Sequence, residues 1–170
     1  MDYFLLACTA FFAISITLPE IRRRHQSDYR HEPISHYLTG PGSTLQDVGF
    51  IVMAVGLFHL ARALGLSVAG IAAALVGAGV LGAMVTDRFP GLFGRHKTRW
   101  HIGSAALAFL AAAPMMLATT EPAGLLGLGA AYLCLPGLCY LLAPRRTSVQ
   151  EKLATATIIL WLLAYAIIGG

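Results

Sequence analysis

One apolar block in the sequence is too long for a single membrane helix. It runs from residue 48 to residue 86 and is interrupted only by His59 and Arg62. Because an α-helix rises about 1.5 Å per residue, about 20 apolar residues cross a hydrocarbon core of about 30 Å. The block therefore predicts two membrane-spanning helices, joined by a tight turn at residues 64–67.

The rest of the chain divides in the same way into apolar stretches of spanning length. Hydrophobic residues make up 57% of the sequence and charged residues 12%, about half the charged fraction of a typical soluble domain. A soluble domain of this size could not bury so much apolar surface. We therefore expect an all-α polytopic membrane protein, a six-helix bundle forming one domain over residues 1–170. The expected spans are residues 3–19, 47–64, 67–86, 101–120, 123–143 and 152–168.

Basic residues mark one side of this predicted bundle. Of the 12 Lys and Arg residues, all except Arg62 lie in residues 22–30, 88–99 and 145–152. With six spans, these three connections share one side of the membrane. The positive-inside rule places them in the cytoplasm and both termini outside. We expect the location to be the bacterial cytoplasmic (inner) membrane.

Composition and spacing also argue against several kinds of site. The basic stretches are spacers between apolar blocks without a nucleic-acid-binding motif, so we expect no nucleic acid partner. Cys8, Cys134 and Cys139 lie inside apolar blocks without CxxC spacing or a nearby His, which argues against disulfides and a metal site. His59 and His101 are predicted at different depths, so they are a poor pair of haem ligands. No cofactor follows from the sequence.

Small residues predict how the spans pack. Helices in lipid approach closely where side chains are small. The third span carries a four-residue ladder of Gly70, Ala74, Ala78 and Gly82, and the fourth carries Ser104, Ala108 and Ala112 at the same spacing. We expect the third span to be the most buried helix, packed through this ladder. Pro114 and Pro136 are expected to kink the fourth and fifth spans.

Polar residues gather at the predicted cytoplasmic face. A glycine-rich, semi-apolar loop bears Ser35 and His36, and Asp47, Asp87 and His101 lie at the neighbouring span ends. The favoured interpretation is interfacial ion pairing of these groups with the nearby basic residues. The alternative is a pocket in which Asp47 or Asp87 orients His36 or His101 as an acid–base or ligand group. His59 is expected to be a satisfied polar residue near the outer interface.

Short motifs in the chain resemble a family of bacterial six-span proteins catalogued as domain of unknown function 998. They comprise Ser35-His36 through Gly40-Pro41, then Gly49-Phe50, Asp87 with Phe89-Pro90, and His101. Two details depart from the family pattern: Asp87 precedes the Phe-Pro pair, and His96 and His101 stand one residue farther apart than the family's His pair. The resemblance covers nearly the whole chain. It implies the six-span fold but no activity.

Three classes of function remain open from the sequence. The first is an integral membrane binding or accessory protein, such as a small subunit of a larger membrane complex. The second is an intramembrane enzyme or lipid-handling protein that uses the cytoplasmic-face His/Asp site. The third is a small transporter, ranked last because no carboxylate lies deep in a span, where transport usually requires one. The expected partners are membrane lipids and either a homo-oligomer or a larger complex.

Overall fold

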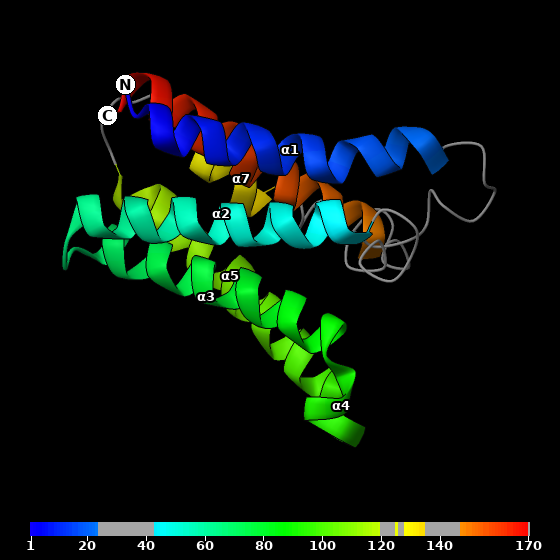
Figure 1. Cartoon of the computed structure of the whole chain (residues 1–170). Coiled ribbons are helices and arrows are strands. Elements are labelled where there is room, and N and C mark those ends of the chain that lie inside the picture. The colour runs from blue at the N-terminus through cyan, green and yellow to red at the C-terminus, as the bar shows by residue number, and fades with distance from the viewer. Residues whose placement is uncertain (24–42, 120–124, 126–127, 135–146, 170) are drawn as a thin grey trace.

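The computed structural model describes residues 1–23, 43–119, 125, 128–134 and 147–169, and this part of the chain is helical without strands (Figure 1). Residues 128–134 are also helical. The other elements in chain order are α1 (Tyr3–Arg23), α2 (Ser43–Leu64), α3 (Val68–Arg88), α4 (Pro90–Phe93), the 3₁₀ helix η3 (Gly94–His96), α5 (Lys97–Ala118) and α7 (Thr147–Ile168).

The fold is that of a helical membrane protein. Four of the described helical segments are long and apolar enough to cross a bilayer, and the apolar part of α1, Tyr3–Pro19, is shorter. The four segments are Thr44–Leu64, Val68–Arg88, Pro90–Ala118 and Val149–Ile168. The expected span 123–143, including Pro136, lies largely outside the described residues. Six spans and the orientation of the termini stay predictions.

The helices extend beyond the stretches that hydropathy marks. Helix α1 continues through Pro19 to Arg23, α5 begins at Lys97 and α7 begins at Thr147. Hydropathy reports which residues suit lipid, whereas backbone hydrogen bonding continues into polar sequence. At the described starts of α5 and α7 and at the end of α1, polar residues that the sequence assigned to loops are therefore helical.

The predicted turn between the second and third spans is confirmed. Gly65 has a φ of 64°, a left-handed conformation that glycine adopts without a Cβ clash. Ser67 is the N-cap of α3, and its hydroxyl accepts a hydrogen bond from the Gly70 amide at 3.0 Å. An N-cap hydroxyl satisfies one of the unpaired amides at a helix start. These residues hold α2 and α3 as an antiparallel hairpin.

Helix α3 is the most buried of the four long segments, as predicted, but its buried face follows a different spacing from that of the predicted ladder. Half of its apolar stretch, 50%, is buried, against 28% to 44% in the others. The predicted ladder is wrong at Ala78, which is exposed. Four-residue steps rotate about 40° each around a helix with 3.6 residues per turn, so such a ladder winds off one face. The buried face instead alternates steps of four and three: Ala72, Val76, Gly79, Ala83 and Thr86.

The contact between α3 and α5 depends on Gly79 and Gly82. A Cβ built at Gly79 would lie 2.6 Å from both the Ala108 nitrogen and the Ser104 carbonyl oxygen. A Cβ at Gly82 would lie 2.5 Å from the Ser104 hydroxyl. Ala108 and Ala112 are buried, so the small residues of the fourth predicted span do form this seam.

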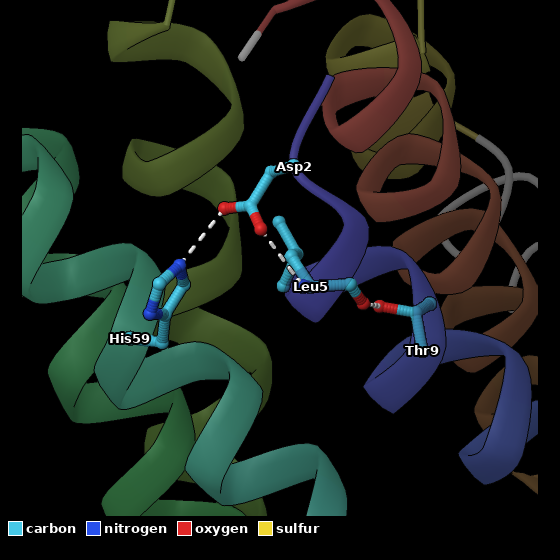
Figure 2. Close-up of polar contacts among 4 residues, drawn as sticks. All are labelled: Asp2, Leu5, Thr9 and His59. Carbon is cyan, nitrogen blue, oxygen red and sulfur yellow. Dashed lines mark hydrogen bonds and ion pairs between the residues drawn. The ribbon is translucent and has the colours of Figure 1, made fainter.

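Asp2 joins three helices at the end of the bundle that holds both termini (Figures 1 and 2). Its carboxylate accepts the Leu5 amide at 3.0 Å and lies 3.0 Å from Nε2 of His59 on α2. Its own amide donates to the Ala166 carbonyl on α7 at 2.7 Å. Burial raises the pKa of Asp2, but the Leu5 amide and His59 outweigh it, so the pKa is lowered. His59 is thus a satisfied polar residue, as predicted.

Candidate functional site

The opposite end of the bundle, which we call the α4 end, brings together the start of α2, the end of α3, and the starts of α5 and α7 (Figure 1). Of the five predicted site residues, Asp47, Asp87 and His101 lie at this end. Ser35 and His36 lie outside the described residues. The site is therefore described from the remaining three and their neighbours.

The structure places Asp87 beside His101. Oδ2 of Asp87 lies 3.1 Å from Nδ1 of His101, and Oδ1 lies 3.4 Å from Nζ of Lys97. Lys97 and His101 are one turn apart on α5, so both reach the same carboxylate. Nδ1 is not aligned for a linear hydrogen bond, so proximity and charge define the contact. The imidazole also interacts with the backbone of Ala83, one turn before Asp87 on α3, so α3 holds the ring at two points.

Asp47 belongs to a separate pair. Its Oδ2 lies 3.4 Å from Nε of Arg88, which connects the start of α2 to the end of α3. Among the described residues, its other oxygen is buried without a hydrogen-bond partner, and so are both side-chain polar atoms of the neighbouring Gln46. Pairing of carboxylates with Arg88 and Lys97 agrees with the ion-pair interpretation, while the Asp87–His101 contact agrees with the alternative.

An apolar cavity extends inward from His101. Its volume is about 80 Å³, several times the ~10–15 Å³ that one water molecule needs. Five helices contribute to its walls, among them Phe12 of α1, Phe50 of α2, Val80 of α3 and Phe109 of α5. The exceptions to this apolar lining are His101 and two residues of α7, Glu151 and Thr155.

A wider groove adjoins the cavity on the side of α5 and α7. It has a volume of about 550 Å³ and is more open to the surroundings. Both spaces are lined by His101, Ala105, Phe109 and Glu151. The groove is also lined by Gln150, whose Nε2 is buried and has no hydrogen-bond partner in the described part of the chain. These shared residues form a partition with one polar edge, made by His101 and Glu151.

The comparisons with known proteins place this arrangement in a family. The pattern of the family described as "Protein of unknown function (DUF998)" matches residues 6–168. The chain belongs to this family. No curated protein and no solved structure matches it. The match confirms the resemblance to DUF998 seen in the sequence. The matched residues include every described element of the site.

Two functional candidates in this DUF998 chain were missed in the sequence. Gln150 and Glu151 were assigned to the third basic stretch, but α7 begins at Thr147 and turns both toward the groove. The predicted topology could have identified them, because it places the start of the sixth span on the same side as Asp87 and His101. A carboxylate at that position was therefore a candidate neighbour of His101.

The described part of this DUF998 chain shows no group of three or more His, Cys, Asp or Glu side chains arranged to hold a metal ion. The α4 end combines hydrogen-bonding and charged groups around His101 with an adjoining apolar space.

Proposed function

We propose that the chain is an integral membrane protein that binds an amphipathic molecule at the α4 end. Its hydrocarbon part occupies the apolar cavity, and its polar group contacts His101 and the groove. The observation that carries the proposal is the partition of His101, Ala105, Phe109 and Glu151, which borders an apolar cavity and a wider groove at once. Apolar pockets with a few convergent polar groups are typical ligand sites.

Unpaired polar atoms at this end support a ligand with hydrogen-bonding groups. A buried polar atom without a partner costs about 1–3 kcal/mol, and Nε2 of Gln150 is such an atom in the groove. Asp87 holds the ring of His101 from the other side, as a carboxylate orients a ligating imidazole. A polar headgroup in the groove satisfies these atoms while its hydrocarbon chain occupies the apolar cavity.

The lateral position of the groove supports entry from the bilayer. Helices α5 and α7 contact each other far less than α3 and α5 do, and the groove lies between them, beside the helical residues Tyr132 and Leu133. An amphiphile can therefore reach the polar edge without crossing the packed α3–α5 seam. Phe109 separates the groove from the inner cavity.

A photoactivatable fatty acid, added to the full chain in nanodiscs, tests the proposal. Crosslinks are expected at Phe109, Val80 or Ile158, which line the inner cavity. Ala105→Phe places a larger side chain at the boundary between the cavity and the groove. It is expected to lower crosslinking in the cavity at least several-fold. Ala78→Leu is the matched control, because Ala78 is exposed on α3. Crosslinks confined to exposed positions such as Ile71 and Leu107 would contradict the proposal.

Acid–base catalysis on the bound molecule is the second candidate, favoured by the 3.1 Å contact of Asp87 with His101. A carboxylate fixes the imidazole so that its free nitrogen exchanges a proton with a bound group. A membrane lipid extract incubated with the purified protein, or with its His101→Ala variant, distinguishes the two. A new species formed only by the unsubstituted protein supports catalysis, and identical extracts contradict it while leaving binding intact.

A further inference from the structure

A second surface lies at the α4 end, on the connection between α3 and α5 and away from the cavity. Residues 88–100 include Arg88, Arg95, Lys97 and Arg99 and no acidic residue. Figure 1 shows α4 at the end of the α3–α5 pair, on the side of the bundle away from α1 and α7. The connection is structured, since α4 leads through Gly94, with φ 50°, into η3 and then α5.

Two of the four basic side chains on this connection form ion pairs with described carboxylates, and the other two do not. Arg88 pairs with Asp47, and Lys97 pairs with Asp87. Arg95 and Arg99 are exposed, and neither forms an ion pair with any residue that the structure describes. The surface therefore presents two guanidinium groups that no described carboxylate neutralises.

Large apolar side chains stand beside these two arginines. Phe89 is 52% exposed, Leu92 is 76% exposed and Trp100 is 59% exposed. The Phe93 and Trp100 rings lie 6.1 Å apart, which holds the indole of α5 against α4. Aromatic rings concentrate at the boundary between lipid chains and headgroups. Guanidinium groups bind phosphate in a bidentate manner.

We infer that this connection is a docking surface for anionic phospholipid headgroups, with Arg95 and Arg99 on the phosphates and with Leu92, Phe89 and Trp100 at the acyl boundary. The occupant is anionic lipid because both free charges are positive and the apolar groups beside them are of the interfacial kind. The inference is independent of the amphiphile cavity, because none of these five residues lines it.

The two tryptophans of the chain make a direct test possible. Trp100 is exposed, whereas Trp161 is fully buried at 0%. Nanodiscs of phosphatidylcholine and phosphatidylglycerol are prepared with bromine on the acyl chains of one lipid at a time. Bromine on phosphatidylglycerol is expected to quench Trp100 more than the same mole fraction on phosphatidylcholine. Trp100→Phe should remove this excess quenching.

Charge variants test whether the two arginines cause the excess quenching by phosphatidylglycerol. Arg95→Gln and Arg99→Gln are each expected to lower the preference by roughly fivefold, corresponding to about 1 kcal/mol per basic residue. Arg→Lys variants should retain much of it. Arg62→Gln, at the other end of α2, is the matched control and should change nothing. Raising the salt to about 1 M, where the Debye length is about 3 Å, should weaken the preference as well.

Two results overturn the inference. Equal quenching by both brominated lipids means that the surface meets the bilayer without selecting anionic headgroups. Absence of quenching by either lipid means that Trp100 is covered by water or by another protein chain. In every variant, unchanged emission from the buried Trp161 verifies that the bundle is folded.

Discussion

The carboxylate of Asp87 lies 3.1 Å from Nδ1 of His101, and this contact joins the last turn of α3 to the second turn of α5. The same carboxylate holds Lys97 at 3.4 Å. One side chain thus fixes the polar end of the α3–α5 pair and also positions the imidazole that borders the cavity. Stability and ligand binding are therefore expected to change together when Asp87 is replaced.

Asp87→Asn is expected to destabilise the fold by about 1–3 kcal/mol, because it leaves partly buried cationic partners without their counterion. Lys97→Gln should cost less, about 0–1 kcal/mol, since the Lys97 side chain is about one-third exposed (35%). Denaturant unfolding in detergent micelles, followed by circular dichroism, measures both. Equal losses would mean that the His101 contact adds nothing to stability.

Gly79→Ala is expected to destabilise the seam between α3 and α5 by about 1–3 kcal/mol through overpacking. Its new Cβ would meet backbone atoms of α5 at 2.6 Å, and backbone cannot move aside cheaply. Gly82→Ala should cost less, because it meets the Ser104 side chain, which can change rotamer.

Gly103→Ala is the control for this pair, since a Cβ there meets nothing within 4 Å. Because Ala favours a helix over Gly by up to about 1 kcal/mol, this variant should be neutral or stabilised. Melting temperatures of the three variants, measured in one detergent, give the order of their stabilities. A Gly79→Ala protein as stable as Gly103→Ala would contradict the observed α3–α5 seam.

The sequence predicted the helical membrane fold because hydropathy and length determine where lipid-facing helices form. It also predicted the Gly65–Ser67 turn, where glycine and an N-capping serine have specific backbone roles. It did not identify the buried face of α3. In a helix so rich in Gly and Ala, several faces are small enough to pack, and only the position of α5 selects Gly79 over Ala78.

The candidate site was predicted in part for a similar reason. Topology put Asp47, Asp87 and His101 at one end, but it could not determine which carboxylate reaches the imidazole. That depends on Lys97 and His101 being one turn apart on α5, and on Arg88 turning toward Asp47. Gln150 and Glu151 were missed because the start of α7 lies in a polar segment that hydropathy assigns to a loop.

Acid is expected to weaken the attachment of α1 through Asp2. The pKa of this carboxyl is lowered in the fold from an ordinary value of 3.8. A carboxyl with a lowered pKa stabilises the folded state fully above the unfolded pKa, and this stabilisation is lost as the pH falls through the folded pKa. The loss should therefore occur below about pH 4.

Asp2→Asn isolates this charge, because Asn caps a helix about as well as Asp and the Leu5 amide keeps an acceptor. The wild-type melting temperature should fall toward that of Asp2→Asn as the pH is lowered below about 4, and exceed it at neutral pH. His59→Gln should reduce the same difference at neutral pH. Parallel curves for wild type and Asp2→Asn would show that the carboxylate of Asp2 adds no stability.

The orientation in the membrane is the last prediction. Both termini and the α2–α3 turn lie at one end of the bundle and α4 at the other (Figure 1). By the positive-inside rule, the basic residues of the α3–α5 connection predict that the α4 end faces the cytoplasm. In a cysteine-free background, Ser67→Cys should react with an impermeant maleimide in intact cells. Thr98→Cys should react only after lysis. Both positions are exposed, so a difference in labelling reports the side of the membrane. Labelling of Thr98→Cys alone in intact cells would invert the orientation, and labelling of both would mean that α3 does not cross the bilayer.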